Sequence, residues 1–168
     1  MTTIIGHTGL TPDALRETFS HFPQGVVLIG AEVDGTRHGL IASTFTVGIS
    51  LDPPLASVAI QLGSSTWELL RSAPSLGVSL LGSHQSGLVR QLASPDRSRR
   101  FAEIETAVDL DGALTVTDSP AHLWTRVHSE MPAGDHTLAL LEILDVTTST
   151  SPEALVFHRS SFKNITAE

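Results

Sequence analysis

The stretch LIASTFTVGISLDPPL, residues 40–55, alternates between two kinds of side chain as far as Leu51. A period of two is typical of a strand with one buried face. The first face is apolar apart from one serine, and it carries Ile41, Ser43, Phe45, Val47, Ile49 and Leu51. The opposite face carries only small residues, namely Ala42, Thr44, Thr46, Gly48 and Ser50. A solvent-facing strand usually carries Lys, Glu or Arg, so we expect another group to pack closely against this small-residue face.

The segments around this strand predict a mainly β protein. Asp34-Gly35 is a hairpin signal that joins the strand to a buried one over residues 25–33. Asp52-Pro53-Pro54 ends it, because proline cannot donate to the hydrogen-bond ladder. Short helices are predicted after Thr11, after Ser64-Ser65 and within residues 84–95. Further strands are expected over residues 55–62, 76–81, 113–116, 121–130, 136–147 and 154–158. Many short strands with few peripheral helices predict an antiparallel barrel with helical insertions.

Length and composition restrict the class of protein. The 168 residues suffice for one domain, which we expect over residues 11–168, after a flexible leader over residues 1–10. The formal net charge of −8 disfavours nucleic acid and anionic membranes as partners. The chain has no cysteine, and its first residues lack the pattern of a signal peptide, so a cytoplasmic location is expected.

Three segments are candidates for a binding site, although the short motifs of nucleotide-binding, hydrolytic and zinc enzymes are absent. QLGSSTW, residues 61–67, joins a strand to a helix, and it suits either a phosphate or an ordinary helix cap. Asp135-His136 starts a strand, and the pair has either a structural role in the turn or a role in a site. RSRRF, residues 97–101, is either a solvated loop or a local source of positive charge. Eight histidines include no pair at i,i+4 spacing, so no metal site is predicted.

Four blocks between residues 11 and 162 carry a recognisable series of motifs. They are HFPQGVVLIGA (21–31), GLIASTFTVGISLDPPLASVAI (39–60), SSTWELLRSAPSLGVSLLGSHQSGLVRQLA (64–93), and PAGDHTLALLEILDV (132–146) with LVFHRSSF (155–162). SLDPPL and AGDHT are the most specific of these motifs. In this order the blocks resemble the flavin reductase family, the split-barrel NAD(P)H:flavin oxidoreductases.

The resemblance implies a Greek-key, antiparallel split β-barrel that forms a homodimer and binds FMN or FAD. NADH or NADPH would pass a hydride to flavin N5, and the reduced flavin would supply a partner monooxygenase. His136 would position the nicotinamide. The flavin would contact Gln24, Leu40, Ile41, Ala42, Ser43, Thr44, Gln61, Leu62, Ser64, Ser65, Thr66, Arg100 and Phe101. Of the basic run, Arg100 matches the family's arginine before phenylalanine, so Arg100→Ala is expected to weaken phosphate binding and Arg97→Ala to matter little.

Several positions depart from the family pattern and bear on the choice of flavin. Ile41 replaces a threonine, Leu62 and Ser65 replace polar or basic residues, and the closing tyrosines are Phe157 and Phe162. Two other activities therefore stay open. The chain could bind or carry flavin for an oxygenase with little reductase turnover, or it could use bound flavin on an organic substrate of its own.

Overall fold

The fold is built on one large antiparallel sheet. The computed structural model describes residues 9–150 and 153–165, so most of the predicted leader lies outside the described residues. The main sheet has seven strands in the order β3-β2-β6-β9-β10-β5-β4. They are β2 (Val27–Val33), β3 (Thr36–Ala42), β4 (Thr46–Leu51), β5 (Pro54–Gln61), β6 (Leu76–Leu80), β9 (Ala121–Ala133) and β10 (His136–Thr148). The predicted antiparallel, mainly β architecture is confirmed.

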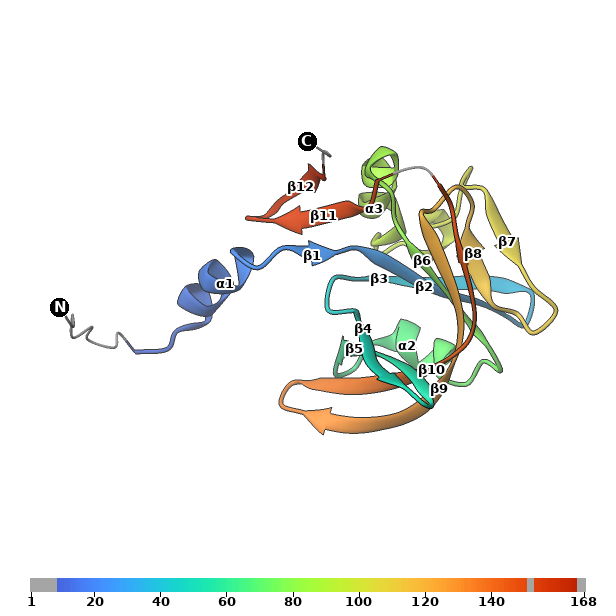
Figure 1. Cartoon of the computed structure of the whole chain (residues 1–168), viewed down its shortest axis with the longest axis horizontal. Coiled ribbons are helices and arrows are strands. Elements are labelled where there is room, and N and C mark those ends of the chain that lie inside the picture. The colour runs from blue at the N-terminus through green and yellow to red at the C-terminus, as the bar shows by residue number, and fades with distance from the viewer. Residues whose placement is uncertain (1–8, 151–152, 166–168) are drawn as a thin grey trace.

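Smaller elements flank this sheet. The other strands are β1 (Gln24–Gly25), β7 (Thr106–Val108), β8 (Leu114–Val116), β11 (Leu155–His158) and β12 (Ser161–Asn164), of which β1-β11-β12 and β7-β8 form two further sheets. The helices are α1 (Pro12–Ser20), α2 (Ser65–Leu70), α3 (Ser86–Leu92), and the 3-10 turns η1 (Ser83–Gln85) and η2 (Arg97–Arg99). Figure 1 shows α1 standing away from the main sheet, on the side where β11 and β12 lie. No helix among the described residues is long and apolar enough to cross a membrane.

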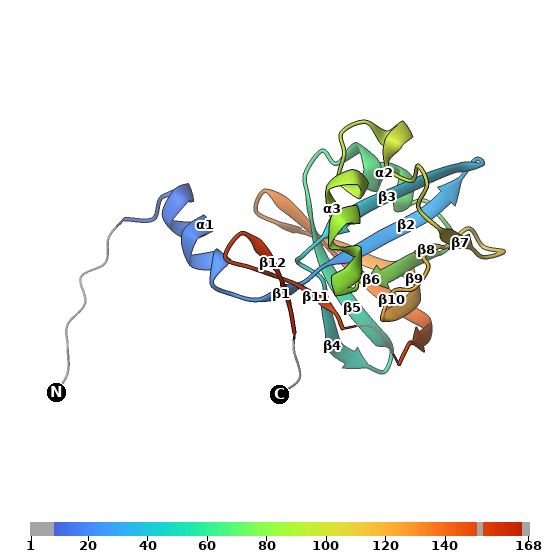
Figure 2. The same ribbon diagram turned by 90° about the horizontal axis from the view of Figure 1, so that it is seen from above.

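Strand β2 is the centre of two hydrophobic clusters. Its residues Val27, Ile29 and Ala31 belong to the cluster inside the main sheet, whereas Leu28 belongs to a second cluster on the opposite face. That second cluster includes residues of α3, and Figure 2 shows α3 lying across β2 and β3. A strand that is covered on both faces needs a continuous apolar run, which explains the sequence VVLIGA.

Three local signals in the sequence give the elements that they predict. The Thr11 hydroxyl accepts a hydrogen bond from the Ala14 N–H at 3.2 Å and caps α1. Asp34 and Gly35 both have positive φ, as a two-residue hairpin turn requires. Ser64 caps α2 by accepting from the Trp67 N–H at 3.3 Å. These predictions depend only on neighbouring residues, and each is confirmed.

The continuous strand predicted over residues 40–51 is wrong. The chain leaves the sheet at Ser43 after β3 and re-enters it at Thr46 as β4, on the opposite edge. Gly48 has φ of 74°, and the register of β4 against β5 shifts between Thr46 and Ser50. The apolar residues of β4 that the alternation assigned to the core are instead exposed in this single chain: Val47 60%, Ile49 44% and Leu51 88%.

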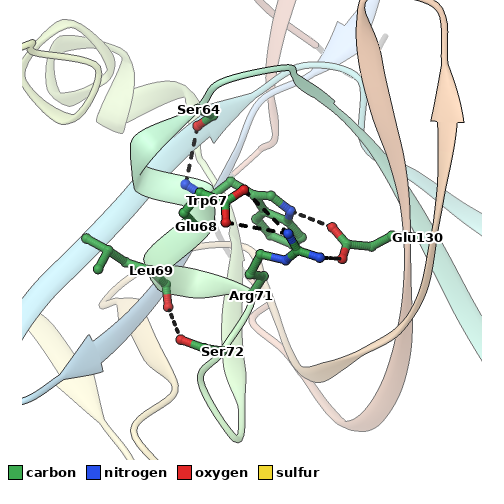
Figure 3. Close-up of polar contacts among 7 residues, drawn as sticks. All are labelled: Ser64, Trp67, Glu68, Leu69, Arg71, Ser72 and Glu130. Carbon is green, nitrogen blue, oxygen red and sulfur yellow. Dashed lines mark hydrogen bonds and ion pairs between the residues drawn. The ribbon is translucent and has the colours of Figure 1, made fainter.

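Helix α2 is held against the sheet by Glu130 of β9 (Figure 3). One carboxylate oxygen accepts from the indole N–H of Trp67 at 2.8 Å, and the other accepts from the Arg71 guanidinium. Trp67 is only 3% exposed, so its N–H needs a partner inside the protein. Glu68 forms a second, longer contact with Arg71, at 3.4 Å. Glu130 therefore fixes the position of α2 relative to β9.

We expect Glu130→Ala to lower the free energy of unfolding by about 2 kcal/mol, because the buried indole N–H loses its acceptor. Glu130→Gln keeps an acceptor oxygen and should cost less. Glu68→Ala is the control, since its contact is exposed and should contribute less than about 0.5 kcal/mol. Urea unfolding measures all three variants. Equal midpoints for Glu130→Ala and Glu68→Ala would contradict this role for Glu130.

Candidate active site

A cleft of about 610 Å³ lies where the main sheet fails to close. Strand β3 is one edge of the sheet, and its free side faces the end of β5 and the start of α2. The lining residues are Leu40, Ile41, Ala42, Ser43, Thr44, Ala59, Ile60, Gln61, Leu62, Gly63, Ser64, Ser65, Thr66, Arg100 and His136. Twelve of the fourteen predicted site residues are thus brought together in one place.

One side of the cleft is a ledge formed by Leu40–Thr44. Leu40–Ala42 of β3 pair only with β2, so the main chain on the other edge of β3 has no strand partner, and Ser43 and Thr44 follow the strand. The Thr44 hydroxyl donates to the Ala59 carbonyl at 3.0 Å and accepts from the Ala59 N–H at 3.2 Å. The Thr44 side chain thus makes the two hydrogen bonds to Ala59 that the backbone of a neighbouring strand would make, and it joins the ledge to β5. The small side chains leave the ledge flat enough for a planar group to approach the backbone.

Strand pairing places His136 opposite this ledge. Its Cα partner in β5 is Gln61, and the Leu62 N–H donates to the Asp135 carbonyl at 3.0 Å. The β9–β10 hairpin turn therefore lies beside the turn that follows β5. The connection between the strands predicted over residues 121–130 and 136–147 is shorter in the structure, because β9 continues to Ala133 and only Gly134-Asp135 form the turn.

The Asp135 carboxylate orients the imidazole of His136. Its Oδ1 lies 2.7 Å from His136 Nδ1. This hydrogen bond, followed by the charge of the imidazole, lowers the pKa of Asp135, so the carboxylate is ionised at neutral pH and acts as an acceptor. In the neutral imidazole the proton then lies on Nδ1, and Nε2 is left as an acceptor for a donor in the cleft.

The turn after β5 brings three consecutive hydroxyls to the cleft, those of Ser64, Ser65 and Thr66, and the Ser64 N–H donates to the Gln61 carbonyl at 3.2 Å. Each accepts a hydrogen bond: Ser64 from the Trp67 N–H, Ser65 from an Arg97 guanidinium N–H, and Thr66 from an Arg100 N–H at 3.1 Å. None of the three donates to another residue of the described chain. A hydroxyl whose oxygen is already accepting still has its own proton to donate. This hydroxyl end (Ser64–Thr66) is therefore suited to an acceptor-rich group such as phosphate.

Arg100 connects the segments around the hydroxyl end. Its guanidinium donates to the carbonyls of Ser94 at 2.6 Å and Gly39 at 2.8 Å, in addition to Thr66. Burial, and then the nearby charge of Arg97, lower the pKa of Arg100, although the group stays protonated. Its Nη2 makes no hydrogen bond to any residue that the structure describes. Arg100 lines the cleft and thus presents unused donors to a ligand.

Two predicted flavin contacts, Gln24 and Phe101, lie outside this cleft. Gln24 is in β1, where it pairs with Phe157 and lines a separate hollow beside α1. The ring of Phe101 is 9% exposed and belongs to the second hydrophobic cluster, where it packs against Gly39 from behind the ledge. The sequence motif placed Phe101 next to Arg100, but Arg100 lines the cleft whereas Phe101 packs in the second cluster.

The sequence analysis missed three lining residues, Ala59, Ile60 and Gly63. Ala59 and Ile60 read as ordinary strand residues, and only the opening of the sheet exposes them to a ligand. Gly63 has φ of 78°, and this turn conformation was detectable from the glycine between strand and helix. Among the described residues no group of three or more His, Asp or Glu side chains is placed to hold a metal ion.

Known proteins match the chain over nearly its whole length. The family model described as flavin reductase like domain matches residues 19–166. An NADH-dependent flavin reductase of a Rhodococcus species is 31% identical over 163 residues, which are 93% of this chain and 88% of that protein.

Solved structures of flavin reductases also resemble this chain over most of its length. The NADH:FAD oxidoreductase of Streptomyces globisporus, in complex with NAD and FAD fragments, has a TM-score of 0.86 at 26% identity and covers 95% of this chain and 98% of its own. BorF, the flavin reductase component of a bacterial two-component tryptophan halogenase, has a TM-score of 0.84 at 26% identity, with 94% and 100% covered. The chain therefore belongs to the flavin reductase family that its sequence motifs resemble.

Proposed function

We propose that this chain transfers a hydride from NADH or NADPH to N5 of FMN or FAD. The observation that supports this most directly is one cleft with a flat ledge at one side and a cationic, hydroxyl-rich end at the other. The ledge suits a planar ring, and the hydroxyl end suits its phosphate. The solved relative with NAD and FAD fragments provides independent support.

The proposed role of the protein is to bind and orient two planar rings, and the flavin supplies the hydride acceptor when bound. The ledge, Leu40–Thr44, would hold the isoalloxazine through main-chain groups. Free N–H groups on the ledge would support negative charge that develops at N1 and O2 of the flavin. Ser64–Thr66 and Arg100 would hold the phosphate. Of the positions that line the cleft, none is an Asp or Glu, so no carboxylate there opposes an anionic cofactor.

His136 is proposed to position the nicotinamide. Its Nε2, left as an acceptor by the Asp135 hydrogen bond, can accept from the amide N–H2 of a carboxamide. Among the described residues, the only titratable side chain bonded to it is Asp135, an ionised carboxylate that already accepts from Nδ1. We therefore assign it orientation of the donor and no proton transfer.

We further propose that the reduced flavin is handed to a separate oxygenase and that the chain acts as a homodimer. The halogenase component BorF is a precedent for the first of these. For the second, the exposed apolar side chains of the edge strand β4, of Phe19 in α1 and of Phe22 just after α1 need a cover. We propose that a second copy of the chain covers these side chains. The cytoplasmic location stays a prediction from the sequence.

The activity is tested by NADH consumption with FMN, FAD and riboflavin in parallel, together with a flavin titration. We expect oxidation of NADH that depends on added flavin. Tight flavin binding without NADH oxidation would identify the chain as a flavin carrier instead, and no binding of any flavin would overturn both readings.

We expect His136→Ala to raise KM for NADH by roughly 3- to 10-fold, as the loss of one hydrogen bond predicts. The flavin dissociation constant should change little, because the flavin is held on the other side of the cleft. His84→Ala is the matched control, since His84 is exposed and lies outside the cleft. Steady-state kinetics with NADH as the varied substrate measure this. An unchanged KM in His136→Ala would remove the positioning role.

Light scattering after size exclusion should give twice the mass of one chain for the wild type. Val47→Asp with Ile49→Asp should shift the protein to the monomer, because charges would be buried at the contact that covers β4. The control is Leu110→Asp, a fully exposed residue of the β7–β8 connection. A monomeric wild type, or a double variant that remains dimeric, would show that β4 is not covered in this way.

A further inference from the structure

The 3-10 turn η2 directs two of its arginines to different places. Arg97 reaches back to the first turn of α2, where its Nη2 donates to the Ser65 hydroxyl. Arg99 instead lines a separate hollow beside α3, together with Arg90, Gln91 and Glu103. The sequence analysis left open whether Arg97 is a solvated loop residue or a local source of positive charge, and it expected Arg97→Ala to matter little. The structure places its charge one hydrogen bond away from the cleft.

Arg97 and Arg100 form a pair of cations without a counterion. Neither makes an ion pair with any carboxylate in the part of the chain that the structure describes. The neighbouring Asp96 is occupied by the N–H and hydroxyl of Ser98, and the arginine that lowers the pKa of this carboxyl is Arg99.

The positive charges of Arg97 and Arg100 act on a neighbouring side chain, that of His38. Burial first, and then the charges of Arg97 and Arg100, lower the pKa of His38, so its imidazole stays neutral at pH 7. The chain as a whole has a net charge of −8. The two guanidinium groups make the region beside the cleft locally positive, which favours an anionic ligand there.

Ser65 transmits this charge to the cleft. Its oxygen accepts from Arg97, so its single proton is left for an acceptor on the side that lines the cleft. A hydroxyl polarised by a guanidinium is a stronger donor than an isolated one. Arg97 thus acts on a ligand through Ser65, whereas Arg100 lines the cleft itself.

We propose that Arg97 is the positioning residue that makes the cleft prefer phosphorylated flavins to riboflavin. This inference rests on the proposed flavin site and adds its selectivity. Arg97 orients the Ser65 hydroxyl toward the flavin phosphate and adds a second positive charge beside Arg100. The isoalloxazine ring lies at the ledge, beyond the hydroxyl end, so the contribution of Arg97 is confined to the phosphate.

The test compares dissociation constants of FMN and riboflavin, measured by quenching of flavin fluorescence, for the full-length wild type, Arg97→Ala, Ser65→Ala and Arg99→Ala. For Arg97→Ala we expect FMN binding to weaken roughly tenfold, as loss of a charge-assisted contact predicts, and riboflavin binding to stay unchanged. Ser65→Ala should show the same split, and Arg99→Ala should match the wild type. The FMN affinity of Arg97→Ala should also depend less on salt.

Four outcomes would overturn the inference, and a fifth would overturn the proposed function as well. Equal weakening of FMN and riboflavin would show that Arg97 only supports the fold of the site. An unchanged FMN affinity in Arg97→Ala, or an equal loss in Arg99→Ala, would show that the charge is not specific to the cleft. If the wild type bound riboflavin and FMN equally, the selectivity would be absent while the flavin site remained, and if it bound neither, the proposed function itself would fall.

Discussion

The site depends on a sheet that does not close. Strand β3 ends at Ala42 without a partner on its outer edge, and the chain crosses to the other edge of the sheet before it continues as β4. The Thr44 hydroxyl donates one hydrogen bond to Ala59 and accepts another from it, and these two bonds join the segment after β3 to β5. Since free main-chain groups must find partners, an open edge of this kind suits a ligand that can hydrogen-bond along it. The small residues that the sequence places there keep the edge accessible.

The two ends of the cleft are fixed by different kinds of interaction. The pairing of Gln61 with His136 sets one end, because a strand register allows only one position for each side chain. The other end depends on α2, whose six residues are too few to be stable without tertiary contacts. Glu130 and Arg100 supply these contacts from opposite sides, from β9 and from the end of η2. Positions far apart in the sequence are thereby held together.

How much of the fold and of the site could be predicted depended on how far apart in the sequence the interacting residues lie. The caps at Thr11 and Ser64 and the turn at Asp34-Gly35 are local, and the sequence was sufficient for them. The break after Ala42 was missed because the alternation of side chains continues across it, and only the pairing of distant strands reveals it. The exposure of β4 in the single chain was missed for a related reason. An apolar pattern indicates that a strand face is covered, but it does not indicate which group covers it. Arg97 and Arg99 could not be told apart, because the direction of each depends on the phase of a single 3-10 turn.

Ile41 has a place in both halves of the molecule. It lines the cleft on one side, and on the other it packs against the second hydrophobic cluster with Leu88 and Phe157. One side chain therefore forms part of the floor of the cleft and also packs in the cluster under α3. A substitution that reshapes the floor must also be accommodated by that cluster, so its effects on affinity and on folding will not be separable. Variation in this surface of the cleft is thus constrained by a hydrophobic core on the other side of the strand.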